Sequence, residues 1–103
     1  FISRSKQEMQ RLLADGVSLE AVAVALGVHR HALQRRLKAM GTSYQQLLDD
    51  VRFEMAQHYM RDTGLSLGEI SALLGYSEPA VFTRAFRRRA GQSPRGWRQA
   101  RLG

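Results

Sequence analysis

The sequence contains no cysteine, and this absence removes several classes of function. Disulfide staples, Fe–S clusters, thiol nucleophiles and Cys-type zinc sites are excluded. A chain of 103 residues needs no such staple, because it can bury about 65% of its unfolded surface in the core of one domain. The lack of cysteine also fits a reducing compartment, so we expect a cytoplasmic protein.

Long apolar runs and alternating strand patterns are also missing. The longest apolar stretch, residues 21–26, is far too short to cross a bilayer, and no segment resembles a secretory signal. No segment alternates between polar and apolar residues for long, so no sheet is expected. The chain begins with Phe1 rather than Met, and we expect it to be part of a longer protein.

Acidic residues and lysines are scarce, whereas arginine is abundant. Lys+Arg is 16 against Asp+Glu 9, and only Lys6 and Lys38 are lysines. Residues 1–41 carry a net charge of +4, residues 42–78 carry −4 and residues 79–103 carry +7. Two basic blocks around an acidic middle indicate two contacts with one extended polyanion. On charge alone, two solvated helix faces remain an equally good interpretation.

Apolar spacing and capping residues predict an all-α fold of seven helices. Capping boxes begin two of them, at Ser43-x-x-Gln46 and Ser66-x-x-Glu69, and glycines end most of them. The helices are expected at 3–15, 19–26, 30–40, 44–62, 67–74, 79–90 and from 94 onward. We expect one domain, with a first half at 1–41, a linking helix at 42–62 and a second half at 63–103.

Each predicted helix has an apolar side that should face the core. In the first helix these positions are Met9, Leu12 and Leu13. The linking helix should bury Leu47, Leu48, Val51, Met55 and Tyr59 and act as a spine between the halves.

The sequence of the first half recurs 48 residues later. The second copy has one extra residue after its turn glycine, so the offset is 49 from there on. Each copy predicts a short helix, a glycine turn and a second, basic helix, which is the helix-turn-helix pattern. In that motif the second helix enters the major groove of DNA. The matched residues are Gly16, Ser18, Leu19, Val22, Leu26, Gly27, Leu33, Arg35, Leu37 and Lys38 with Gly64, Ser66, Leu67, Ile70, Leu74, Gly75, Phe82, Arg84, Phe86 and Arg87.

The faces of the two second helices follow from 100° of rotation per residue. The inward positions are Leu33, Leu37 and Met40 in one helix and Phe82, Ala85 and Phe86 in the other. Arg89 lies on the same side near the helix end, where its stem can pack while its charged head reaches water. Arginine and glutamine bond bidentately to guanine and adenine, and the methyls of alanine and threonine can touch the thymine methyl. Ordinary solvated positions are the alternative. The outward residues, which we expect to read bases, are His31, Gln34, Arg35, Lys38, Ala80, Thr83 and Arg84.

The two outward faces differ in kind. The first is rich in hydrogen-bond donors, so we expect it to discriminate bases more strongly. The second should rely more on phosphate and thymine-methyl contacts. Arginines flank both faces and are candidates for phosphate contacts, although each alone could be a solvated surface residue. These candidates are Arg30, Arg36, Arg87, Arg88 and Arg95.

The second half closely resembles the signature of the AraC/XylS transcription regulators. The matching run is Leu65-Ser66-Leu67-x-Glu69-Ile70-Ser71-x-Leu73-Leu74-Gly75-Tyr76-Ser77-Glu78-Pro79-x-x-Phe82-x-Arg84-Ala85-Phe86-Arg87-Arg88-x-x-Gly91-x-Ser93-Pro94. The first half is similar over 18–37, so the resemblance covers about residues 5–100.

The resemblance implies two helix-turn-helix units joined by a long helix, with the helices at 30–40 and 79–90 in successive major grooves. It also implies a bacterial regulator of transcription. In the full-length protein, it implies RNA polymerase as a partner and an effector that binds only a domain absent from this chain.

The resemblance also assigns roles to individual residues of this chain. The resemblance assigns base reading to His31, Gln34 and Arg35 and to Ala80, Val81 and Arg84. The face geometry instead turns Val81 inward and Thr83 outward. His29 stands where the family usually has a serine N-cap, and His31 where a long side chain is frequent. Trp97 stands at the usual aromatic position and is expected in the core.

Catalysis finds little support in the sequence. His29 and His31 are two positions apart on a helix and diverge, so they cannot share a metal. No base, nucleophile or glycine loop accompanies the carboxylates of Asp49, Asp50 and Glu54. We therefore expect no enzyme, cofactor or metal. Two alternatives remain: a basic helical module that binds protein or RNA, and a domain in which only one half contacts DNA.

Overall fold

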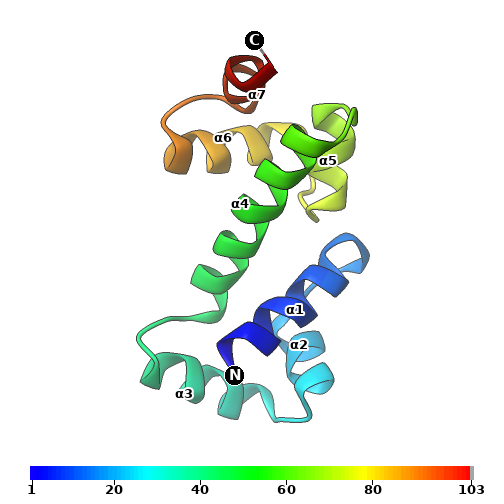
Figure 1. Ribbon diagram of the computed structural model, residues 1–103. Coiled ribbons are helices and arrows are strands. Elements are labelled where there is room, and N and C mark those ends of the chain that lie inside the picture. Colours follow the sequence, from blue (N-terminus) through cyan, green and yellow to red (C-terminus); the bar gives the residue numbers. More distant parts are fainter. Residues whose placement is uncertain (103) are drawn as a thin grey trace. The chain divides into compact units, whose positions relative to one another are not determined.

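A computed structural model describes residues 1–102 of the chain (Figure 1). Within them lie seven α-helices, one short 3-10 helix and no strand, which confirms the predicted all-α fold. The α-helices are α1 (Ile2–Leu12), α2 (Leu19–Leu26), α3 (Arg30–Ala39), α4 (Tyr44–Asp62), α5 (Leu67–Leu73), α6 (Pro79–Ala90) and α7 (Pro94–Leu102), and the 3-10 helix η1 is Leu13–Asp15.

The chain divides into two compact units, Phe1–Arg52 and Phe53–Gly103, and the division falls inside α4. Each unit contains one helix pair of the repeat, α2 with α3 or α5 with α6. The single-domain organisation expected from the sequence stays a prediction.

The first unit has a continuous aliphatic core. The helix α1 packs against α2, and α2 packs against α3 (Figure 1). The side chains that fill this core are Met9, Leu13, Val22, Ala23, Leu33, Leu37, Leu47, Leu48 and Val51.

The second unit is built around aromatic rings. The Phe86 ring lies 5.2 Å from Phe53, 6.0 Å from Phe82 and 6.0 Å from Trp97, measured between centroids. The contacts with Phe82 and Trp97 are edge-to-face, and aromatic pairs of this kind add to the burial energy of the rings. Trp97 is only 4% exposed, which confirms its predicted place in the core.

Serine caps begin four of the helices, including the two that the capping boxes predict. The hydroxyl oxygens of Ser18, Ser43, Ser66 and Ser93 accept hydrogen bonds from backbone N–H groups three residues onward, at 3.0–3.1 Å. Each bond satisfies a donor that would otherwise lack a helical partner. At the start of α3, His29 performs this task, because its Nδ1 accepts from the His31 N–H at 3.2 Å.

Several details of the expected helices are wrong. The first α-helix ends at Leu12, and residues 13–15 form a tighter 3-10 turn. Leu12 is only half-buried. Met40, expected in the core, is 50% exposed because α3 ends at Ala39 and Met40 is its C-cap residue.

The apolar stripe of α4 also differs from the prediction. Leu47, Leu48 and Val51 are buried as expected. Farther along, Met55 and Tyr59 are half-buried, and Ala56 and Met60 are buried in their place. The reason is that the second part of α4 belongs to a different unit, and Ala56 and Met60 are buried in the core of that unit.

Candidate nucleic-acid interface

The two helix pairs share the same turn geometry. Gly27 and Gly75 both have positive φ angles, +72° and +83°, which glycine adopts without a steric penalty. Each turn is closed by the same pair of backbone bonds. In the first unit the Gly27 N–H donates to the Val24 carbonyl, and the Val28 N–H donates to the Ala23 carbonyl. The same two bonds occur 48 positions later, from Gly75 to the Ala72 carbonyl and from Tyr76 to the Ser71 carbonyl. The sequence repeat is therefore a structural repeat.

The second helix of each pair has one buried and one exposed face. In α3, Leu33 and Leu37 are fully buried, and in α6, Phe82 and Phe86 are 2% exposed. Val81 is half-buried, which agrees with the face geometry rather than with the family position. The outward residues are all exposed, namely His31, Gln34, Arg35, Lys38, Ala80, Thr83, Arg84 and Arg87. The side chains proposed to read bases thus lie on the solvent side of each helix.

Two of the phosphate candidates on α3 already contact other groups. Arg30 Nη1 lies 3.0 Å from the Glu20 carboxylate, in a pair that solvent reaches freely. A backbone hydrogen bond, and then the bond from Arg30, hold the pKa of Glu20 below its usual value. The Arg36 guanidinium lies 4.8 Å above the Phe1 ring in a cation–π contact. Exposed contacts of these kinds are weak, so a DNA phosphate could compete for either arginine.

The remaining phosphate candidates belong to the second unit. Arg87, Arg88 and Arg95 are all exposed. Arg87 and Arg88 lie in the last turn of α6, and Arg95 in the first turn of α7.

The arginines at the C-terminal end of the chain do not act as one basic block. Arg98 is half-buried, and its guanidinium donates to the backbone carbonyls of Met60, Thr63 and Leu65 at 3.0, 3.0 and 2.6 Å. Arg101 stacks on the Trp97 ring at 3.9 Å. Arg98 therefore has a structural role that charge counting along the sequence missed.

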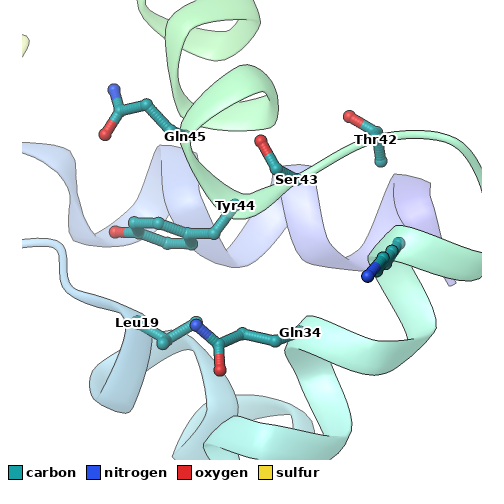
Figure 2. A pocket seen from close by; sticks show the side chains of 7 residues that line it. Leu19, Gln34, Thr42, Ser43, Tyr44 and Gln45 are labelled. Carbon is teal, nitrogen blue, oxygen red and sulfur yellow. The ribbon is translucent and has the colours of Figure 1, made fainter.

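A groove of about 410 Å³ beside α3 also escaped the sequence analysis (Figure 2). It continues the exposed face of α3, because Gln34 and Lys38 form part of its lining. The other lining residues are Leu19, Thr42, Ser43, Tyr44 and Gln45. Its walls come from three elements that meet only in the folded chain, so helical periodicity could not have revealed it.

Neither a metal cluster nor a membrane helix is found in the part of the chain that the structure describes. No group of three or more His, Asp or Glu side chains is arranged there to hold a metal ion. None of the helices there is long and apolar enough to span a bilayer.

Comparison with known proteins places this arrangement in a family. Residues 22–100 match the family model described as a helix-turn-helix domain. The chain is 43% identical over 100 residues to the ornithine utilization regulator of Pseudomonas aeruginosa, covering 97% of this chain and 30% of that protein. It is 42% identical over 90 residues to the transcriptional regulator VirS of Mycobacterium tuberculosis, covering 86% of this chain and 26% of that one.

The fold has close counterparts among solved structures. A DNA-binding transcriptional dual regulator from Escherichia coli K-12 superposes with a TM-score of 0.88, at 24% identity, over 96% of this chain and 95% of that chain. The present chain spans less than a third of the length of the two curated relatives. The match to the family model and the likeness to the two relatives, both of them regulators rather than enzymes, show that the chain belongs to the helix-turn-helix family of AraC-type transcriptional regulators.

Proposed function

We propose that α3 and α6 enter successive major grooves of duplex DNA and together read one extended site. Sequence-specific DNA binding by a transcriptional regulator follows from the family. The observation that supports the two-groove arrangement is the repeat itself. Two helices with matching turns present matching exposed faces, each behind a buried apolar face.

Base reading is assigned to the exposed faces of these helices. On α3, Gln34 and Arg35 offer the bidentate donors suited to adenine and guanine edges, and His31 and Lys38 extend the face. On α6, Arg84 is the main base-reading donor, whereas Ala80 and Thr83 offer methyl groups for thymine. We therefore expect α3 to contribute more to base discrimination than α6.

Phosphate contacts are assigned to the arginines around these faces. Such contacts fix the position of the protein on the duplex and make its affinity depend on salt, but they carry no sequence information. Arg30 and Arg36 would give up their weak contacts with Glu20 and Phe1 to reach a phosphate. The proposed set is Arg30, Arg36, Arg87, Arg88 and Arg95.

The role of Arg35 tests this function. Bound sites are first selected from a random duplex pool, and affinity is then measured for the selected and a random duplex. Replacing Arg35 by alanine should cost on the order of 1–3 kcal/mol on the selected duplex and much less on the random one. Arg11→Ala is the control, because it removes the same charge from α1, outside both helix pairs.

Two results would contradict the proposal. One is an equal loss on both duplexes for Arg35→Ala, which would remove Arg35 from the base-reading face. The other is equal affinity of the wild-type chain for the selected duplex and for single-stranded RNA. That result would favour a general basic module.

For the whole protein we propose a bacterial regulator that acts in the cytoplasm, where its DNA lies. The relatives are named as regulators and are more than three times as long as this chain, which supports a role as the DNA-binding part of a longer protein. We further propose that a small effector acts through the rest of that protein and that RNA polymerase is its partner.

A further inference from the structure

The groove beside α3 joins the base-reading face to the start of α4. Gln34 and Lys38 line it from α3, Leu19 lines it from the start of α2, and the rest of the lining comes from residues 42–45. In Figure 2 the Tyr44 ring lies opposite the side chains of Leu19 and Gln34. A duplex that contacts Gln34 and Lys38 would therefore bring its backbone to the mouth of this groove.

The lining combines apolar surface with groups that bind anions. Leu19 and the Tyr44 ring are apolar, Thr42 and Ser43 bear hydroxyls, and Lys38 carries a positive charge. No carboxylate is among the seven lining residues. A deoxyribose–phosphate unit has the matching chemistry, because its sugar face is apolar and its phosphate is anionic and accepts hydrogen bonds.

The Tyr44 hydroxyl is suited to donate to such a phosphate. Burial raises the pKa of Tyr44 above its ordinary value. Nearby Arg52 lowers this pKa and nearby Glu20 raises it, but burial is the largest effect. A phenol of ordinary pKa is already protonated at neutral pH, and burial acts in the same direction, so Tyr44 can donate a hydrogen bond and does not repel an anion.

The second unit repeats this region with more positive charge. Gly41-Thr42-Ser43-Tyr44-Gln45 and Gly91-Gln92-Ser93-Pro94-Arg95 are 50 positions apart. Gly41 and Gly91 have φ angles of +78° and +79°, and each segment supplies the serine cap of the following helix. At the repeat positions of Lys38 and Gln45, the second unit carries exposed Arg87 and Arg95. A cation at the shared position of Lys38 and Arg87, and a second one at Arg95, favour a phosphate over a neutral small molecule as the occupant.

We propose that the groove binds one sugar–phosphate unit of the strand that borders the bases read by α3. Tyr44 and Gln45 then become DNA contacts in addition to the residues on α3. This inference rests on the proposed function, since it requires α3 to lie in the major groove.

Replacing single phosphates by neutral methylphosphonates tests the role of Tyr44. On the selected duplex, each phosphate near the bases read by α3 is replaced in turn. The wild-type chain should lose about three- to tenfold in affinity at one of these phosphates. In the Tyr44→Ala variant, a methylphosphonate at that position should no longer reduce affinity, whereas methylphosphonates at the other positions should reduce it as they do for the wild type. Tyr44→Phe, which preserves the packing of the ring, should lose the part that depends on the hydroxyl.

A matched pair of charge changes tests the rim of the groove. Gln45 donates a hydrogen bond to Asp49 along the exposed side of α4, and Gln10 is exposed on α1. Gln45→Glu places a negative charge beside the proposed phosphate, and Gln10→Glu makes the same change of net charge elsewhere. At low salt Gln45→Glu should weaken duplex binding about tenfold more than Gln10→Glu, and the difference should shrink as salt rises.

The outcomes separate this inference from the proposed function. Arg35→Ala, measured on the same duplexes, reports on base reading by α3. If Arg35→Ala loses sequence preference while Tyr44→Ala responds to every methylphosphonate like the wild type, the groove assignment is wrong and the function stands. A small molecule that occupies the groove without competing with DNA would also overturn it. If Arg35→Ala keeps its preference, the proposed function itself fails.

Discussion

The hydroxyl of Ser71 is buried without a hydrogen-bond partner in the described part of the chain. The residue is 1% exposed on α5, and its backbone carbonyl accepts from Tyr76 at 3.1 Å, whereas its Oγ is unsatisfied. A buried polar group in this state costs free energy. In the first unit the equivalent residue is Ala23, 2% exposed and with the same backbone bond from Val28. The repeat thus shows that a methyl group fits this position.

We predict that Ser71→Ala raises the free energy of unfolding by about 1 kcal/mol, because it removes the unsatisfied hydroxyl and keeps the packing. Urea denaturation measures the change, and duplex affinity should stay the same. Ala23→Ser is the reciprocal control, which should lower stability by a similar amount. A less stable Ser71→Ala variant would show that the hydroxyl has a partner in solution.

His29 is an unusual N-cap residue, which is why its role was difficult to predict from the sequence. The family pattern has serine at this N-cap, and histidine is not among the usual capping residues. In the structure the unprotonated Nδ1 of His29 performs the task of the serine oxygen by accepting from the His31 N–H. Histidine can replace serine here because a ring nitrogen, like a hydroxyl oxygen, can accept a hydrogen bond from a backbone N–H group.

Among the elements, the turn from α4 to α5 depends on one side chain of α7. The Arg98 guanidinium donates to carbonyls of the last turn of α4 and of the segment that follows it. Helix C-termini leave carbonyls without partners, and a cation there also complements the helix dipole. Arg98 lies 50 positions after the buried Leu48, at the equivalent position of the repeat, and is itself half-buried.

We predict that Arg98→Ala lowers the free energy of unfolding by about 3 kcal/mol, because three charge-assisted hydrogen bonds to backbone carbonyls are lost. The Arg98→Lys variant should keep only a small part of the stability that Arg98→Ala loses, since an ammonium group cannot bond to all three carbonyls as a guanidinium does. At temperatures where the variants remain folded, the salt dependence of duplex binding should be unchanged.

The exposed neighbour Arg95 provides the contrast for this prediction. Arg95→Ala should leave stability nearly unchanged and reduce the slope of log affinity against log salt by about 1, as for a phosphate contact. If Arg98→Ala instead reduced the salt slope and kept its stability, the structural role of Arg98 would be wrong.

For the whole molecule, helical periodicity predicted much of the fold and of the exposed faces. Leu33, Leu37, Phe82 and Phe86 are buried as expected, because a rotation of 100° per residue fixes which side chains share a face. Helical periodicity does not predict contacts between elements. Arg98 resembles its exposed neighbours in sequence, and only the packing of α7 near the end of α4 reveals its carbonyl partners. The groove at Tyr44 escaped prediction for the same reason.

The division between the two compact units falls inside α4, between Arg52 and Phe53, and an insertion at this point provides a test. One alanine inserted between these two residues rotates everything after it by about 100° and shifts it by about 1.5 Å along the helix. The insertion does not change the spacing among the buried α4 residues of the first unit, which end at Val51. It also does not change the spacing between Ala56 and Met60, which are buried in the second unit. Each unit should therefore still fold, with an unfolding free energy close to that of the wild type.

DNA binding should respond differently, because two grooves of one duplex can be occupied together only if α4 holds both recognition helices at a fixed rotation. On a duplex with two half-sites one helical turn apart, the wild-type chain should bind far more tightly than on a duplex with one half-site. The insertion should abolish this advantage and leave the single-half-site affinity unchanged. Equal affinity of the wild type for both duplexes would mean that only one half reads DNA.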